Sequence, residues 1–142
     1  MEIRPFTLTD EAAVVDLWRE CGLTRPWNDP HQDIRRKLTT QPELFLVGAI
    51  DHVLVASAMA GFDGHRGWVN YLAVSPAHRH QGLGRLLMRD VEERLVARGC
   101  PKLNVQIRTN NHSVLEFYRR LGYAVDDVTS CGKRLILDAP GA

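Results

Sequence analysis

The chain of 142 residues has little cysteine, little net charge and no long apolar run. Its three cysteines are an odd number without Cys-x-x-Cys spacing, so we expect reduced, partly buried thiols. Together with the six histidines they show no metal-ligand spacing, so we expect no metal site. A formal net charge of +1 gives no indication of a nucleic-acid or membrane partner. No segment approaches the roughly 18 apolar residues that span a bilayer.

The chain also lacks an apolar signal region in its first residues, Met1 to Pro5, so we expect a cytoplasmic protein. Its hydrophobic content of 44% and charged content of 25% are typical of a soluble globular protein. This length is enough to bury a core, and we expect a single domain over residues 1–142.

Apolar periodicity and turn residues predict an alternation of strands and helices in the order β-α-α-β-β-β-α-β-α-β-β. This order indicates an α/β (α+β) fold, with helices on the faces of a mixed sheet. The expected strands are residues 2–6, 44–50, 53–62, 68–75, 103–107, 123–128 and 134–137. The expected helices begin at Thr9 or Asp10, at Pro30, near Leu83, and at Asn111 or Ser113.

The chain is organised around residues 68–98, which predict a strand, a glycine-bearing turn and a helix. Pro76 ends the strand because proline cannot donate to a sheet ladder. Gly82 and Gly84 allow the backbone to approach a ligand closely. The apolar residues that follow at helical spacing predict one buried helix face, made of Leu83, Leu86, Leu87, Val91 and Leu95. The free amides of the helix start favour an anion, usually a phosphate.

Two well-known phosphate-binding motifs are absent from this turn. The third glycine of a dinucleotide fingerprint would fall at Leu87, and the Gly-Lys-Ser/Thr of a Walker A loop does not follow. On its own, Arg79-x-x-Gly82-x-Gly84 is also compatible with a simple tight turn. Its interpretation therefore depends on the flanking sequence.

The flanking sequence supplies two further motifs. Residues 72–76 read Leu-Ala-Val-Ser-Pro, and residues 111–123 read Asn-His-Ser-Val-Leu-Glu-Phe-Tyr-Arg-Arg-Leu-Gly-Tyr. With the glycine turn they resemble the acetyl-CoA signature of the GNAT superfamily of N-acetyltransferases, and the resemblance covers nearly the whole chain. It implies a mixed, mostly antiparallel central sheet and transfer of an acetyl group from acetyl-CoA to an amine, without a metal.

The resemblance also implies which residues contact the donor. The backbone of Leu72, Ala73 and Val74 pairs with the pantetheine arm of coenzyme A, as an added strand would. The pyrophosphate lies on the amides of the turn, and Arg79 and Arg85 add positive charge. The implied turn residues are His80, Gln81, Gly82, Leu83, Gly84 and Arg85. Asn111 matches an asparagine that contacts the cofactor, and it is equally suited to cap the following helix.

Tyr118 occupies the position of the family's general acid, which protonates the departing thiolate of coenzyme A. A phenol with a pKa of ~10 is protonated at neutral pH and can donate. From spacing alone, Tyr118 is also compatible with a core tyrosine on the apolar face of the last helix.

The general base of the family is not matched. Many relatives place a carboxylate on the strand before the glycine turn, where this chain has Asn70, and others use a glutamate where this chain has Gln106. An amide cannot accept a proton, so the base lies elsewhere, or water relays the proton, or the amine arrives already neutral. The candidates from loops are Asp29, Asp63 and His65, each of which also suits a turn or a helix cap. Trp27, in a polar loop, either lines the acceptor site or covers the core.

The sequence leaves the amine open: a small molecule, a peptide or a protein can supply it. A monomer and a homodimer are both compatible with it. Two other functions stay open at this point. One is an acyl-CoA-binding module without turnover, because the usual carboxylates are missing. The other is a nucleotide-phosphate binder that uses the same turn without thioester chemistry.

Overall fold

The computed structural model describes residues 1–138, which form two compact units. The first unit comprises residues 1–105 together with Asp138, and the second comprises residues 106–137. No helix within residues 1–138 is both long enough and apolar enough to cross a membrane.

The first unit is built on a five-stranded sheet in the order β1-β2-β3-β4-β5. Neighbouring strands run antiparallel, except that β5 runs parallel to β4. The strands are β1 (Glu2–Pro5), β2 (Phe45–Ile50), β3 (Val53–Phe62), β4 (Gly67–Val74) and β5 (Leu103–Val105). The mixed, mostly antiparallel sheet predicted from the sequence is confirmed.

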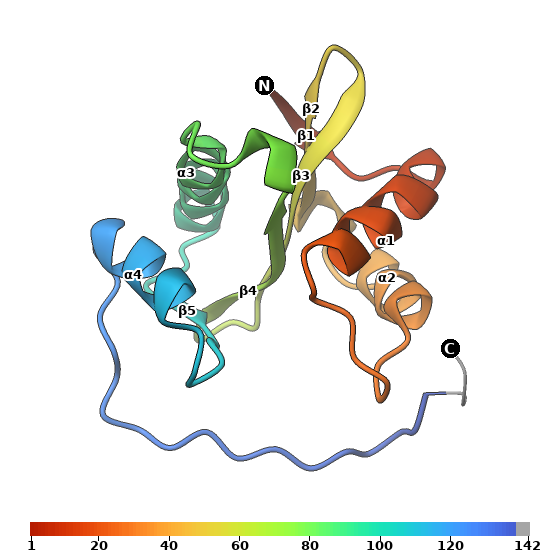
Figure 1. The fold of residues 1–142 in the computed structure, drawn as a ribbon. Coiled ribbons are helices and arrows are strands. Elements are labelled where there is room, and N and C mark those ends of the chain that lie inside the picture. Colours follow the sequence, from red (N-terminus) through yellow and green to blue (C-terminus); the bar gives the residue numbers. More distant parts are fainter. Residues whose placement is uncertain (139–142) are drawn as a thin grey trace. The chain divides into compact units, whose positions relative to one another are not determined.

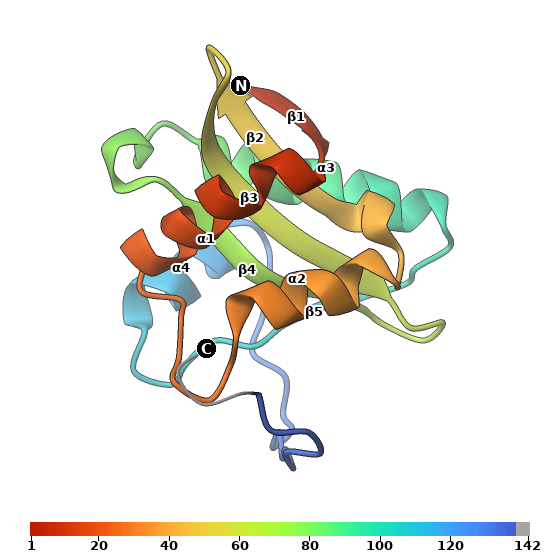
Figure 2. The same cartoon turned by 90° about the vertical axis from the view of Figure 1, so that its right-hand side faces the viewer.

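Three helices cover the two faces of this sheet. Figure 1 shows α3 (Leu83–Ala97) on one face, and α1 (Glu11–Glu20) with α2 (Pro30–Leu38) on the other. In the turned view α1 and α2 lie in front of the sheet and α3 lies behind it (Figure 2). Short 3-10 turns occur at Leu8–Asp10, Pro42–Leu44 and Pro76–His78.

Local sequence explains where these elements begin and end. The hairpin between β2 and β3 turns at Asp51 and His52, whose φ angles of 48° and 65° are both positive, as a type I′ turn requires. The side chain of Asp29 accepts a hydrogen bond of 2.9 Å from the backbone of His31 and caps α2, with Pro30 at the first helical position.

The core on the α1 face is closed by stacked aromatic rings. The rings of Phe6 and Phe45 lie 4.4 Å apart, and those of Trp18 and Phe45 lie 6.1 Å apart. Ile34 of α2 is fully buried against the same cluster.

The predicted buried face of α3 needs one correction. Leu86 is 48% exposed, whereas Met88 is fully buried beside Leu87 and Val91. At about 100° of rotation per residue, Leu86 lies farther than Met88 from the mean direction of the other apolar residues. The apolar pattern therefore predicted Leu86 on the buried face of α3, where the structure has Met88.

The second unit contains α4 (His112–Arg120), and its predicted final strands are not formed. Residues 123–128 and 134–137 pair in no strand, so the expected last strand pair is wrong for the described residues. The apolar side chains of this stretch are 67–86% exposed, namely Val125, Val128, Leu135, Ile136 and Leu137. A hairpin without a buried face is marginal, which explains why the alternation alone did not make strands. Cys131, expected to be partly buried, is also exposed.

Candidate active site

Strand β4 carries a bulge at Tyr71. Ser57 of β3 pairs with Ala73, and Met59 pairs with Asn70, so one residue of β3 faces two residues of β4. Tyr71 adopts a φ of 53°, which is unusual for a bulky residue and costs of order 1–3 kcal/mol. Such strain persists only where the surrounding contacts fix it, and it is concentrated at functional sites.

Side chains from three elements hold the bulge in place. The Ser57 hydroxyl donates to the carbonyl of Tyr71 at 3.0 Å, and the Trp18 indole donates to the Ser57 oxygen at 2.9 Å. The Trp18 and Tyr71 rings stack 3.8 Å apart at an interplanar angle of 11°. The Tyr71 hydroxyl donates to the carboxylate of Asp33 on α2 at 2.5 Å. The bulge therefore connects α1, β3 and α2.

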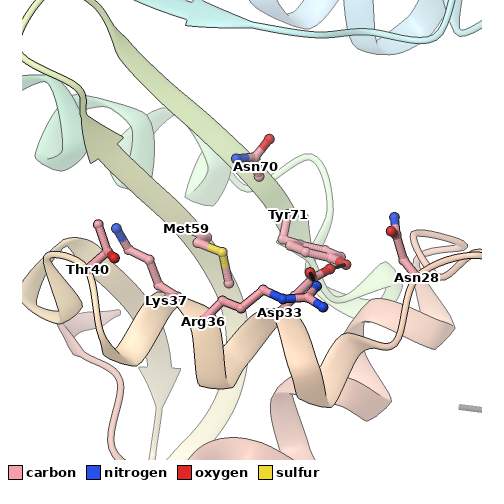
Figure 3. A pocket seen from close by; sticks show the side chains of 8 residues that line it. All are labelled: Asn28, Asp33, Arg36, Lys37, Thr40, Met59, Asn70 and Tyr71. Carbon is pink, nitrogen blue, oxygen red and sulfur yellow. Dashed lines mark hydrogen bonds and ion pairs between the residues drawn. The ribbon is translucent and has the colours of Figure 1, made fainter. Parts of the chain in front are cut away.

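A cavity of about 450 Å³ opens between α2 and the bulge (Figure 3). Its lining is predominantly polar and comes from α2, β3, β4 and nearby loop residues. It consists of Asn28, Asp33, Arg36, Lys37, Thr40, Met59, Asn70 and Tyr71. Small-molecule sites have volumes of this order, and a few polar groups fix the orientation of the ligand in them.

The charges at one end of the cavity are connected to one another. Arg36 pairs with Asp33 at 3.1 Å and with Asp138 at 2.6 Å. Asp138, whose side chain is only 2% exposed, also accepts a 2.6 Å hydrogen bond from the backbone of Asp29. Burial and the neighbouring Asp33 raise the pKa of the Tyr71 hydroxyl well above its usual range, so Tyr71 stays a donor. Asp33 is thus a carboxylate that two partners orient toward the cavity.

Sequence reasoning missed Asp33. Ile34 and Leu38 are the clear apolar pair of α2, so the apolar pattern gives no indication of a role for Asp33. A signal was nevertheless present, since Asp33, Arg36 and Lys37 are three or four residues apart and share one helix face. A charged stripe on a helix that faces a sheet is a candidate ligand surface.

The residues predicted for the acceptor side lie in different places, and none of the four lines this cavity. Asp29 is buried as the cap of α2. The side chain of Asp63 accepts hydrogen bonds from the backbone of His65 at 2.8 Å and Arg66 at 2.7 Å, which is a turn role, and those bonds lower its pKa. His65 is exposed in that turn. Trp27 is 55% exposed, and its neighbour Asn28 reaches the cavity.

The predicted donor stretch of β4 directly follows the bulge. β5 pairs with β4 only at Gly67–Val69, and the described pairing of the later residues 70–74 is with β3. The thiol of Cys21, the residue after α1, donates to the carbonyl of Val74 at 3.3 Å. Leu72 and Val74 are partly exposed, while Ala73 is buried.

The glycine turn presents its backbone to solvent. Arg79, His80, Gln81, Gly82 and Arg85 are exposed. Gly82 has a φ of 75°, and a side chain there would meet nothing within 4 Å. Gly84 and the buried Leu83 lie in the first turn of α3. The first amides of α3 have no partner within the helix and lie at the positive end of its dipole.

The second unit holds the remaining two predicted residues. The side chain of Asn111 accepts a 3.4 Å hydrogen bond from the backbone of Val114, so it caps α4. Tyr118 is the buried residue of α4, with only 5% of its surface exposed, and Phe117 and Tyr123 pack edge-on against it. Burial raises the pKa of the Tyr118 hydroxyl, so the phenol remains protonated over the physiological range. Gln106 donates to the hydroxyl of Ser130 at 2.7 Å.

Residues 1–138 contain no group of three or more histidine, cysteine, aspartate or glutamate side chains placed to hold a metal ion.

Comparisons with known proteins identify the class. The acetyltransferase (GNAT) family model matches residues 12–123. An acetyltransferase of Yersinia pestis (strain Pestoides F) is 49% identical over 138 residues, which are 97% of this chain and 98% of that protein. Ard1 from Thermoplasma volcanium has a similar fold, with a TM-score of 0.77 at 21% identity over 88% of this chain and 83% of that chain. AAC(6')-Iy, solved with the bisubstrate analogue CoA-S-monomethyl-acetylneamine, also has a similar fold. The TM-score is 0.78 at 17% identity, over 94% of this chain and 98% of that chain.

The chain belongs to the acetyltransferase (GNAT) family. It is an acetyl-CoA-dependent acetyltransferase that transfers the acetyl group to an amine. The family resemblance and the activity predicted from the sequence are confirmed, and the two non-catalytic alternatives are set aside.

Proposed function

We propose that the cavity between α2 and β4 receives the acceptor amine and that the carboxylate of Asp33 accepts the proton that this amine loses. One observation carries this proposal: a polar cavity of about 450 Å³ opens at the strained bulge of β4. The residues that follow the bulge, Leu72 to Val74, are those that the family resemblance assigns to the donor. An amine in the cavity would therefore lie next to that stretch of strand.

On the donor side, we propose that acetyl-CoA binds along Leu72–Val74 and the turn at residues 79–85, with a contact from Asn111. The exposed amides at the start of α3 suit the pyrophosphate, and Arg79 and Arg85 supply positive charge beside it. These amides can donate hydrogen bonds to phosphate oxygens, because they have no acceptor within the helix.

The proton steps are assigned to two side chains. The amine nitrogen forms a bond to the thioester carbonyl carbon, and the carbon–sulfur bond breaks. Asp33 accepts the proton that the amine loses, directly or through water, and Tyr71 and Arg36 fix the carboxylate for this role. Tyr118 donates its proton to the departing sulfur, and its raised pKa keeps that proton available.

We further propose that both units serve one acetyltransferase domain, residues 1–142, because the family match extends from one into the other. Three segments, residues 25–30, 63–67 and 97–102, are similar to the small bacterial acetyltransferase called YpeA, and we propose a close relationship with it. We propose a small-molecule or peptide amine as the acceptor.

Kinetics of Asp33→Asn and Tyr118→Phe test these roles, with amines from peptides, lysine, polyamines and aminoglycosides as acceptors. Each substitution keeps the shape of its side chain, so each should lower kcat about 10²–10⁴-fold. Matched controls are Asp16→Asn on the exposed face of α1 and Tyr123→Phe beside Tyr118, which should retain activity. A variant that keeps wild-type turnover removes its residue from the mechanism.

Gly82→Asp tests the phosphate site by calorimetry with coenzyme A. The new carboxylate would face the pyrophosphate in open space, so affinity should fall at least tenfold, which is about 1.4 kcal/mol. Gly82→Ala carries the same backbone strain without the charge, and its affinity should fall less. Equal affinity of Gly82→Asp and wild type would exclude a phosphate at this turn.

A further inference from the structure

We propose that Lys37 binds an anionic group of the acceptor, so that the enzyme selects amines that carry a carboxylate about one helical turn away from the reacting nitrogen. This inference rests on the proposed function, because it takes the cavity at α2 as the acceptor site. It adds the chemical class of the acceptor, which neither the family nor the fold specifies.

Lys37 is a half-buried cation that forms no ion pair among the described residues. Among the ion pairs of residues 1–138, none within 4 Å involves Lys37, and its ammonium donates no described hydrogen bond. The carboxylate of Glu43 acts to raise the pKa of Lys37, but Glu43 is paired with Arg98 at 2.7 Å. Burial lowers the pKa of Lys37 despite that carboxylate. Desolvating a charge without a partner is costly, so a structural role alone does not account for this side chain.

The second cation of the cavity is already engaged. Arg36 is held by Asp33 at 3.1 Å and by Asp138 at 2.6 Å. An incoming anion would have to displace one of these carboxylates from Arg36, whereas at Lys37 it displaces none. The cavity wall also contains Thr40, which lies beside Lys37, and Asn70 on β4, and both side chains can donate further hydrogen bonds to an anion (Figure 3).

The two ends of the cavity set the spacing of the acceptor's groups. Asp33 and Lys37 are four residues apart on α2, so their Cβ atoms lie about 5–6 Å apart on one helix face. An ammonium at Asp33 and a carboxylate at Lys37 would be separated by a similar span. Two extended residues cover about 7 Å, so a dipeptide fits, whereas the adjacent groups of a single α-amino acid are too close.

Matched probes test this class: glycylglycine, its C-terminal amide, and glycine. For wild type we expect kcat/KM to be at least tenfold higher with glycylglycine than with the amide or with glycine. Lys37→Met should reduce the preference over the amide to within about twofold, through a higher KM with kcat retained. Lys37→Arg should keep the preference, because it restores the charge.

Arg35→Met is the control, since Arg35 is exposed on the same helix and does not line the cavity. It should behave as wild type. Equal rates with glycylglycine and its amide would overturn the selection of an anion while leaving acetyl transfer in the cavity intact. If Asp33→Asn and Lys37→Met both left the acetylation of every probe unchanged, the amine would not enter this cavity, and the proposed function would fail as well.

Competitive labelling with acetic anhydride gives a readout that does not depend on turnover. The label at Lys37 is measured by mass spectrometry against exposed Lys133 as an internal reference. Glycylglycine should protect Lys37 at least threefold, and the amide should protect it much less. Equal labelling with and without glycylglycine would overturn the proposal even if no probe were acetylated.

Discussion

Helices α1 and α2 lie on the same face of the sheet, but they bury different kinds of side chain (Figure 2). α1 buries an apolar stripe of Val14, Val15, Leu17 and Trp18. The buried residues of α2 are only Pro30 and Ile34. The remaining inner surface of α2 is charged and faces the cavity. α1 therefore anchors the bulge of β4 through apolar contacts. α2 makes fewer apolar contacts, and its polar side chains line the cavity.

The different roles of α1 and α2 follow from the contacts that each side makes with the bulge at Tyr71. From the α1 side the bulge is held by ring stacking and by the hydrogen bonds through Ser57. From the α2 side it is held by a single hydrogen bond to Asp33, which can also face a ligand. Substitutions on α1 should therefore change stability more than those on α2, which should mainly change catalysis.

Trp18→Ala should have the largest effect on stability. The side chain is fully buried, stacks on two rings and donates to Ser57. Its loss should lower the free energy of unfolding by about 3–5 kcal/mol, as for other large-to-small core changes. Urea denaturation measures this, with Trp27→Ala as the control, since Trp27 is 55% exposed and should cost far less. Similar losses for the two variants would contradict the anchoring role of α1.

The elements that the sequence predicted well are those fixed by local chemistry. The hairpin between residues 44–50 and 53–62, and the helix that starts at Pro30 with Asp29 as its cap, depend on residues within one turn of chain. The mixed, mostly antiparallel sheet followed from the order of these elements along the chain and from the family resemblance. The last two strands were predicted wrongly, because alternation at residues 123–137 specifies a face without supplying anything to cover it.

The site was harder to predict because its parts are distant in the sequence. Nothing near Tyr71 marks a bulge, since it has neither glycine nor proline beside it, and the strain is held by Trp18, Ser57 and Asp33 from other elements. The family motif predicts the donor residues through their spacing. The acceptor side has no such motif, and the loop residues selected for it proved to be caps and turns where their bonds are described.

Asp10→Asn and Asp29→Asn compare the carboxylates at the starts of α1 and α2. The Asp10 carboxylate caps the turn before α1 and pairs with Arg4 at 2.7 and 2.9 Å. The hydrogen bonds from Arg4 hold its pKa below the usual range, against the effect of burial. Hydrogen bonds to charged groups contribute about 1.5–3 kcal/mol, so we expect a loss in that range at pH 7. Asp29→Asn at α2 should cost only a few tenths of a kcal/mol, since asparagine caps equally well.

The pH dependence of that loss follows from the direction of the pKa shift. A carboxyl whose pKa is lower in the folded state stabilises the protein above its unfolded pKa of about 3.9, and the stabilisation disappears as the pH falls through the folded value. The difference between wild type and Asp10→Asn should therefore be constant from pH 7 to 5 and shrink below about pH 4. Urea denaturation at several pH values measures it, and a difference that persists unchanged at pH 2 would contradict the assignment.

Lys37→Met should have the smallest effect, and in the opposite direction. Lys37 lies on the ligand-facing side of α2, and burial lowers its pKa, so its charge is less favourable in the folded protein than in the unfolded chain. Methionine keeps the length of the side chain and removes that cost, so stability at pH 7 should rise by about 0.5 kcal/mol. Arg35→Met, on the exposed face of the same helix, should change stability by less. The gain should vanish at high pH, where the lysine of the wild type is neutral in both states. A loss of stability in Lys37→Met would contradict this prediction. It would show that Lys37 stabilises the fold, as the buried residues of α1 do, and that the two helices do not differ at this position.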